Sequence, residues 1–226
     1  MGHLCRPDIL YNGDMQPEIS HNGTRQNYDR LSRWYDSFSA SERHFTEAGL
    51  QLLDAQLGEN ILEIGFGTGH ALVELADAVG NTGRICGIDL SPGMFAVANH
   101  RIRRAGMEGR ISLQLGDATC LPFANDHFHA VFMSFTLELF ETVEIPPVLA
   151  ECRRVLQPGG RLGIVSLLKN DTRAVEIYEW FHMHFPVVVD CRPIFVQQVL
   201  EAAGFRTGKS EEKQLWGLPV AAVIAR

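Results

Sequence analysis

The chain has 226 residues, of which 46% are hydrophobic and 21% are charged, and its formal net charge is -7. This size and composition are typical of one large globular domain, with or without a small appendage. The negative charge argues against a nucleic-acid partner, because phosphates require a basic face, and no run of about 18 apolar residues is available to span a membrane.

The first 58 residues are predicted to precede the main domain. Residues 1–24 are polar and rich in Gly, Pro and Asn without a clear period, so we expect an N-terminal arm. Residues 25–58 have helical spacing, with Tyr28, Leu31 and Tyr35 on one face of the first helix. We therefore expect a helical segment before the main domain, which begins at residue 59.

From residue 60 onward, strands and helices alternate. Strands are predicted at 60–64, 84–90, 111–117, 129–137 and 161–168, and helices at 70–79, 91–106 and 145–156. Ser91 is expected to cap the second of these helices, with Pro92 in its first turn. Most of the strands are continuous apolar runs, which is typical of a parallel sheet covered by helices on both sides.

The alternation stops after Leu168. A helical insertion is expected at about 169–191, followed by a helix at 193–204 and two strands at 205–213 and 215–225. These two strands are so close in sequence that they must pair antiparallel. The pattern predicts an α/β three-layer sandwich over residues 59–226, whose mostly parallel seven-stranded sheet has one antiparallel strand near the edge.

The segment ILEIGFGTGH (residues 61–70) places three glycines at alternate positions after a predicted strand. Glycine is unfavourable inside regular elements, so the loop is expected to let a ligand approach the backbone, at the sheet edge where ligands bind in such folds. The dinucleotide pattern G-x-G-x-x-G/A is not met, because its sixth position is His70 or Leu72. A nucleotide-dependent oxidoreductase is disfavoured for this reason and because a Tyr-x-x-x-Lys pair is lacking.

The pattern E-x-G-x-G-x-G at residues 63–69 resembles the signature of S-adenosylmethionine-dependent methyltransferases of the Rossmann-like class. Further matching motifs follow in family order: GIDLSPGM (87–94), LGDATCLPF (115–123), HFHAVFMSF (127–135) and RVLQPGGRLGIVS (154–166). The resemblance covers about residues 59–168. It implies a Rossmann-like sandwich, S-adenosyl-L-methionine as the cofactor and S-adenosyl-L-homocysteine as the product.

The resemblance also implies which residues contact the cofactor. The glycines would let its methionine part rest on bare backbone, Asp89 would accept the ribose hydroxyls, and Asp117 would accept from the adenine amino group. The full set of implied cofactor-binding residues is Tyr28, Glu63, Gly65, Gly67, Gly69, Asp89, Leu90, Met94, Asp117, Ala118 and Ser134.

Glu63 has two interpretations. A carboxylate in a buried strand is costly unless it is hydrogen-bonded. It can brace the glycine loop by accepting backbone N–H groups, or it can hold the ammonium group of the cofactor, directly or through water. We favour bracing combined with an indirect contact.

Within the superfamily, the motifs YDRLSRWYD (28–36) and SFTLELF (134–140) are similar to those of the ubiquinone/menaquinone-biosynthesis type. This similarity implies a helical lid at 25–58 and a small, apolar or aromatic, quinone-like acceptor, although lipid head groups, thiols and other small nucleophiles are also methylated in the wider group. The expected substrate-pocket residues are Tyr35, Phe135, Trp180 and Phe181. For Tyr28 and Tyr35, packing in the core is the alternative.

Methyl transfer is an in-line displacement with a neutral thioether as leaving group, so it depends mostly on proximity and desolvation. A base is needed only if the nucleophile arrives protonated. His182 and His184 are the candidates for that base, although an exposed position at a helix end is equally compatible with either. Because residues at i and i+2 do not share a helix face, the two histidines predict no metal site.

The remaining expectations concern partners and location. Five dispersed cysteines without a CxxC pair argue against a disulfide framework and favour reduced thiols in the cytoplasm. An arsenic methyltransferase is disfavoured, because Cys86 and Cys152 fall inside a predicted strand and helix. We expect a small-molecule substrate, no nucleic acid, and a monomer or homodimer. A cofactor-binding regulatory or scaffold subunit without turnover is the alternative from another functional class.

Overall fold

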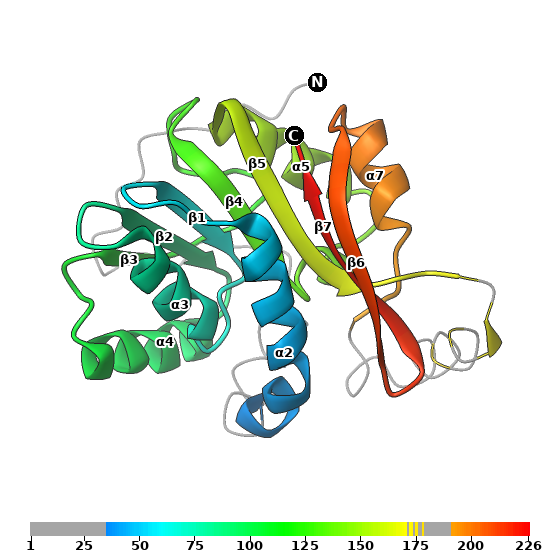
Figure 1. The fold of residues 1–226 in the computed structure, drawn as a ribbon, viewed down its shortest axis with the longest axis horizontal. Helices are drawn as coiled ribbons and strands as arrows, with labels where there is room; N and C mark the ends of the chain where they lie inside the picture. The colour runs from blue at the N-terminus through cyan, green and yellow to red at the C-terminus, as the bar shows by residue number, and fades with distance from the viewer. Residues whose placement is uncertain (1–34, 171, 174, 176–177, 179–190) are drawn as a thin grey trace.

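The computed structural model describes residues 35–170, 172–173, 175, 178 and 191–226, with side chains from residue 42 onward. One seven-stranded sheet runs through it in the order β3-β2-β1-β4-β5-β7-β6 (Figure 1). The strands are β1 (Asn60–Ile64), β2 (Arg84–Asp89), β3 (Ile111–Leu115), β4 (Phe128–Ser134), β5 (Leu156–Leu167), β6 (Thr207–Leu215) and β7 (Leu218–Ala225).

Strands β1 to β5 are parallel, and β7 is antiparallel to both of its neighbours, β5 and β6. The β6–β7 hairpin turns through Trp216 and Gly217, which both have positive φ, as a tight two-residue hairpin requires. The mostly parallel seven-stranded sheet with one reversed strand next to the edge is therefore confirmed.

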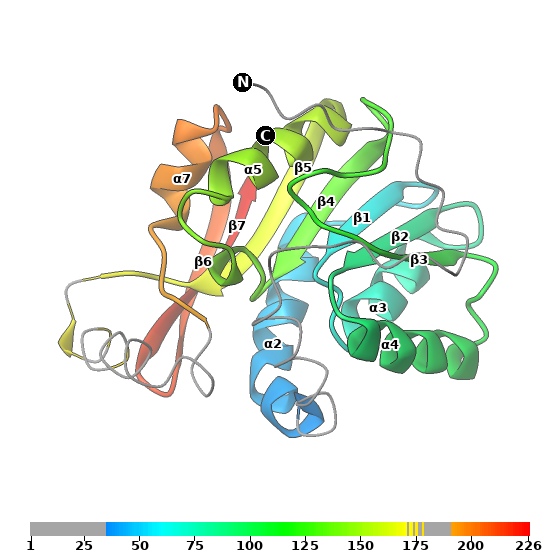
Figure 2. The same cartoon turned by 180° about the vertical axis from the view of Figure 1, so that it is seen from behind.

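Helices cover both faces of the sheet, because the apolar strands must be buried on each side. α2 (Tyr35–Leu53), α3 (His70–Val79) and α4 (Pro92–Ala105) pack on one face, and α5 (Ile145–Val155) and α7 (Val196–Ala202) pack on the other (Figures 1 and 2). Within the described part of the chain, no helix combines the length and the apolar content that crossing a bilayer would need.

Helix α2 belongs to the main core. Its Phe45 and Leu53 are buried in the same hydrophobic cluster as strands β1, β4 and β5, and the helix contacts β4, β5, β6 and β7. Gly49 permits this close approach, because a Cβ atom there would overlap the Val165 side chain. The helix thus brings a segment that is distant in sequence to the end of β4.

The fold differs from the sequence prediction at the start of β5. The helix α5 ends at Val155, one residue before its predicted end, and β5 begins at Leu156 rather than at residue 161, so the segment QPGG lies inside the strand. Leu156 pairs with Phe128, and the register then shifts before Ala130 pairs with Arg161. The residues that read as a turn therefore form an irregular, bulged start of the strand, because Pro158 lacks an N–H and Gly159 has a φ of 81°.

Candidate functional site

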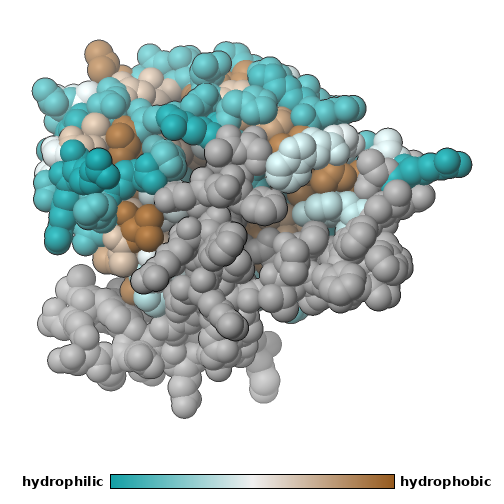
Figure 3. Space-filling view, turned by 90° about the horizontal axis from the view of Figure 1, so that it is seen from below, coloured by the Kyte–Doolittle hydropathy of each residue, from teal (hydrophilic) through white to brown (hydrophobic). Residues whose placement is uncertain are grey.

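A cavity of about 250 Å³ lies where the parallel strands end. Its walls come from the carboxyl ends of β1, β2, β3 and β4, from α2, α3 and α4, and from the short helix η1 (Leu137–Leu139). Figure 3 views this side of the molecule, on which most of the described surface is hydrophilic, with hydrophobic side chains showing between the polar ones. Ligands of open α/β sheets bind at this end of the strands.

The three glycines after β1 all have positive φ, but their surroundings differ. A Cβ atom on Gly65 would overlap the side chain of Thr136, and one on Gly69 would lie 2.9 Å from the Cβ of Ala98 in α4. A Cβ atom on Gly67 would meet nothing within 4 Å, and Gly67 lines the cavity. Bare backbone therefore faces open space at Gly67, whereas Gly69 lies outside the cavity lining and serves the packing of two helices.

Asp89 ends β2 and braces the glycine loop. Its Oδ2 atom accepts a hydrogen bond from the backbone N–H of Gly67 at 2.9 Å, and its Oδ1 atom accepts one from Ser91 at 2.9 Å. Burial raises the pKa of Asp89 to about 6, although the N–H groups of Ser91, Gly67 and Leu90 oppose the rise. The bracing role that we expected of Glu63 thus belongs to Asp89.

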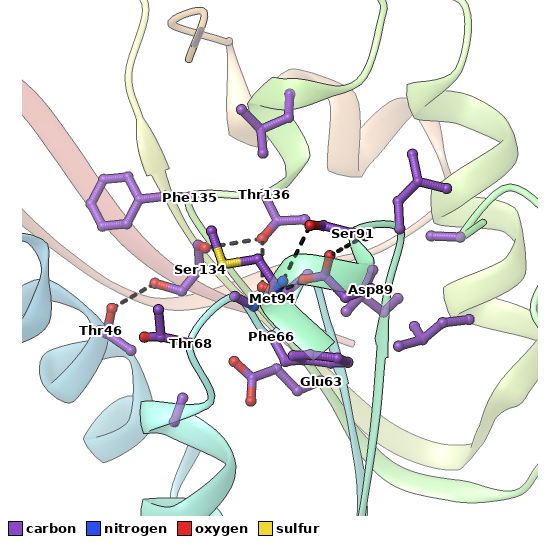
Figure 4. A pocket seen from close by; sticks show the side chains of 18 of the residues that line it. Thr46, Glu63, Phe66, Thr68, Asp89, Ser91, Met94, Ser134, Phe135 and Thr136 are labelled. Carbon is purple, nitrogen blue, oxygen red and sulfur yellow. Dashed lines mark hydrogen bonds between the residues drawn. The ribbon is translucent and has the colours of Figure 1, made fainter. Parts of the chain in front are cut away.

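Glu63, one residue before the end of β1, has a buried carboxyl group, and only 3% of the residue's surface is exposed. Its Oε2 atom has no hydrogen-bond partner among the described residues, and the side chain lines the cavity (Figure 4). Burial raises its pKa well above the ordinary value, and the nearby carboxylates of Asp89 and Glu74 raise it further. A buried acceptor in this state has the chemistry to bind a cation or another hydrogen-bond donor.

The tip of β3 forms a third part of the cavity wall. Asp117 is fixed there, because its Oδ1 atom accepts hydrogen bonds of 2.8 Å from both the backbone N–H and the hydroxyl of Thr119. Met94 lines the cavity from the first turn of α4, whose N-cap Ser91 accepts from the Met94 N–H at 3.2 Å. The predicted cap at Ser91, with Pro92 at the helix start, is confirmed.

The remaining part of the cavity lies between α2 and the end of β4. The hydroxyl oxygens of Thr46 and Ser134 are 2.7 Å apart, and both side chains line the cavity (Figure 4). Phe135 follows with a φ of 50° and forms an edge contact with Phe45 at 6.3 Å. Non-glycine residues rarely adopt this backbone conformation, and strained residues of this kind are enriched at functional sites.

Charged side chains surround the rim of the cavity. Arg43 in α2 pairs with Glu47 at 3.0 Å and with Glu74 of α3 at 3.6 Å. Burial raises the pKa of Glu74. The nearby carboxylate of Glu47 raises this pKa further, whereas the charge of Arg43 lowers it. Among the charged side chains that line the cavity, acidic ones outnumber basic ones; the acidic residues are Glu42, Glu63, Glu74, Asp89, Asp117, Glu141 and Glu144.

The structure brings most of the predicted cofactor residues to this one cavity. Those that line it are Glu63, Gly65, Gly67, Asp89, Leu90, Met94, Asp117, Ala118 and Ser134, together with the predicted substrate residue Phe135. Tyr28, Trp180, Phe181, His182 and His184 lie outside the described residues, and Tyr35 begins α2 with its side chain outside the description.

Several lining residues were missed by the sequence analysis. They are Arg43 and Thr46 in α2, Phe66 and Thr68 in the glycine loop, and Thr136, Leu139 and Phe140 after β4. These last three could have been found, because Thr136 lies at the carboxyl end of the strand predicted at 129–137 and Leu139 and Phe140 come shortly after it. No local signal marks Thr46, which reaches the site only through the packing of α2 on the sheet.

Three of the cysteines, Cys86, Cys152 and Cys191, carry free thiols in the part of the chain that the structure describes. The cytoplasmic location and the monomer or homodimer stay predictions.

Comparison with known proteins agrees with this geometry. Residues 61–160 match the family model described as a methyltransferase domain. The 2-phytyl-1,4-naphtoquinone methyltransferase of Thermosynechococcus vestitus is 31% identical over 166 residues, which cover 73% of this chain and 70% of the relative. That of Synechococcus elongatus is 31% identical over 145 residues, or 62% of this chain and 61% of the relative.

A solved structure shares the fold. The SAM-dependent methyltransferase of Aquifex aeolicus superposes with a TM-score of 0.61 at 21% identity, covering 80% of this chain and 88% of the other. The chain spans 61%, 61% and 58% of the length of the first three curated relatives that it matches. The chain belongs to the class I S-adenosylmethionine-dependent methyltransferases.

Proposed function

We propose that this protein transfers a methyl group from S-adenosylmethionine to a small apolar or aromatic acceptor with a quinone-like ring. One observation carries the proposal. A single cavity at the ends of the parallel strands is lined by the open backbone of Gly67, by Asp89 and by Glu63. The Glu63 Oε2 atom has no hydrogen-bond partner among the described residues.

The cavity fits the chemical parts of this cofactor. The buried Glu63 oxygen lacks a described partner, and the ammonium group of the methionine end would supply one. Asp89 would accept the ribose hydroxyls with its remaining lone pairs, while Asp117, Ala118 and Met94 would surround the adenine ring.

The carboxylate of the methionine end needs a cation, and Arg43 is the arginine that lines the cavity among the described residues. Its ion-pair partner Glu74 lies near enough to Glu63 to raise the pKa of that carboxyl group, which supports a position for Arg43 beside the ammonium group. If Arg43 holds that carboxylate, Arg43→Met should weaken binding of S-adenosylmethionine but not of an analogue without the carboxylate. Equal weakening of both ligands would remove Arg43 from this role.

The bound cofactor supplies an electrophilic methyl group on a sulfonium whose leaving group is a neutral thioether. The protein's part is to align the acceptor and to exclude water. Phe135, Leu139 and Phe140 offer apolar walls for a ring beside the end of β4. If the acceptor arrives protonated, Glu42, Glu141 and Glu144 are carboxylates at the cavity that can take the proton, beside the predicted bases His182 and His184.

The quinone-like acceptor is supported by the relatives named as 2-phytyl-1,4-naphtoquinone methyltransferases. A screen of small acceptors, scored by the release of S-adenosylhomocysteine, tests the proposal. We expect release with hydroxylated aromatic acceptors. If S-adenosylmethionine binds but no acceptor leads to release of S-adenosylhomocysteine, a regulatory or scaffold subunit is favoured. Binding of NADPH in place of S-adenosylmethionine would overturn the assignment.

A further inference from the structure

We propose that the hydroxyl groups of Thr46 and Ser134 together bind an oxygen atom of the acceptor, so that the acceptor is a hydroxylated ring. The inference rests on the proposed methyl transfer and adds to it a chemical class of substrate and two positioning residues.

The pair joins two elements at the cavity. Thr46 lies in the fourth turn of α2, and Ser134 is the last residue of β4. Their oxygen atoms are 2.7 Å apart, and both side chains are partly exposed within the cavity lining. Figure 4 shows the two hydroxyls pointing toward each other between α2 and the end of the strand.

Counting hydroxyl protons shows what the pair can bind. Each hydroxyl has one proton and two lone pairs, so the hydrogen bond between them uses one of two protons. If Ser134 is the donor, Thr46 can reach the Glu42 carbonyl at 3.4 Å, and the pair offers lone pairs only. If Thr46 is the donor, the Ser134 proton is available to a ligand. A hydroxyl group on the acceptor fits both arrangements, because it can donate and accept.

The neighbouring hydroxyl, that of Thr136, already donates its proton to the backbone. The Thr136 hydroxyl lies 3.0 Å from the Ser134 carbonyl and 3.4 Å from that of Gly65, so its proton is directed to the backbone. The side chain of Thr136 is also buried. Thr46 and Ser134 are therefore the neutral hydroxyl groups best placed for a ligand at this end of the cavity.

The surroundings of the pair fit an aromatic ring. The Phe135 side chain is buried against Phe45, and Leu139 and Phe140 also line the cavity. The pair also lies next to the glycine loop: Glu63 is in register with Phe132, which places Ser134 at the level of Gly65. A hydroxyl bound by the pair would hold the ring carbon beside it close to the cofactor's reactive end.

A binding role differs measurably from a structural tie between α2 and β4. The test uses the protein saturated with S-adenosylhomocysteine, to which 1-naphthol or naphthalene is added, and the ratio of the two dissociation constants is measured by fluorescence. A neutral hydrogen bond contributes about 3- to 10-fold in affinity. In Thr46→Val and in Ser134→Ala, 1-naphthol should lose about that factor relative to naphthalene, while Thr46→Val should bind S-adenosylhomocysteine as the wild type does.

Thr82→Val is the matched control, because Thr82 is exposed in the turn between α3 and β2, and it should leave the ratio unchanged. A ratio that is the same in the wild type and in both variants would overturn the proposal, even if the variants melt at lower temperature. A wild-type cavity that takes neither naphthalene nor 1-naphthol would also overturn it. Failure of the proposed function is distinct, because it would appear in other measurements: the wild type would not bind S-adenosylhomocysteine, or would not release it from S-adenosylmethionine with any acceptor.

Discussion

The carboxylate of Asp89 holds the backbone of Gly67 at 2.9 Å, across the gap between the ends of β1 and β2. Gly67 has a φ of 49° and open space where a side chain would be. One acidic side chain thus fixes the bare backbone of the loop, and its remaining lone pairs face the cavity. The shape of the cofactor site and its charge therefore depend on the same residue.

Replacement of Asp89 by Asn should weaken cofactor binding without unfolding the protein. The amide keeps one acceptor oxygen, so either the Gly67 N–H or the ribose hydroxyls lose a charge-assisted hydrogen bond. Such bonds contribute about 1.5–3 kcal/mol, which predicts a loss of roughly 10- to 100-fold in affinity for S-adenosylmethionine. Isothermal titration calorimetry measures it, with the exposed Asp77→Asn as control. Wild-type affinity in Asp89→Asn would contradict the assigned role.

Cofactor binding should weaken in mild acid. Burial raises the pKa of Asp89 to about 6, and ribose hydroxyls prefer the ionised carboxylate. Affinity should therefore fall as the pH drops below about 6, by up to about tenfold per unit for one proton. Titrations between pH 5 and 8 in the wild type and in Asp89→Asn isolate this group from Glu63, whose pKa is also raised. The same pH profile in both proteins would argue against Asp89 as the titrating group.

Gly67 and Gly69 should respond differently to replacement by alanine. Gly67→Ala places a methyl group in open space, so its main effect should be on cofactor affinity, with about 1–2 kcal/mol of strain from the positive φ. Gly69→Ala adds a clash with Ala98 and should lower the melting temperature more. Thermal melts and cofactor titrations separate the two effects. Gly109→Ala, which meets open space without a positive φ, is the control. A larger loss of affinity in Gly69→Ala than in Gly67→Ala would refute this division.

Glu63→Gln should stabilise the protein without cofactor and reduce the stabilisation that cofactor brings. The pKa of Glu63 is raised in the folded state, so at pH values above its ordinary pKa of 4.5 this carboxyl group lowers the free energy of unfolding. A neutral amide does not have this destabilising effect. A gain of about 1 kcal/mol would raise Tm by roughly 2–4 °C for a domain of this size. S-adenosylmethionine should then add less to Tm than in the wild type, because the ammonium loses an ionised partner.

Thermal melts with and without cofactor measure both the predicted rise in the Tm of the cofactor-free protein and the smaller increase in Tm on cofactor binding. Glu108→Gln, at an exposed turn position, should change neither value. A lower Tm for cofactor-free Glu63→Gln would mean that the carboxyl group stabilises the fold. That result would contradict the inference drawn from its Oε2 atom, which has no hydrogen-bond partner among the described residues.

The sequence predicted the elements whose signals are local. β1 and α3 have the predicted bounds, and Asp89 and Asp117 line the cavity because parallel strands end at the same edge of a sheet. The separate reasons for the three glycines were not predictable, because they depend on Thr136 and Ala98, which are far away in the sequence. The role of Asp89 as a brace was missed for the same reason, since Gly67 comes near it only when β1 and β2 pair.

The helix α2 shows the same limit on the substrate side. Its helical spacing was recognised, but Arg43 and Thr46 reach the cavity because Gly49, Phe45 and Leu53 seat the helix on the sheet. Nothing in the sequence near Thr46 indicates that its hydroxyl meets Ser134, 88 positions further along the chain.

The most direct test of the central claim is a crystal structure of the protein with S-adenosylhomocysteine. We predict that the ribose hydroxyls bind Asp89, that the amino group lies within hydrogen-bonding distance of the Glu63 carboxylate, and that the ligand passes over Gly67. A ligand bound away from these strand ends, or one in the cavity whose ribose and amino group contact neither carboxylate, would contradict the account.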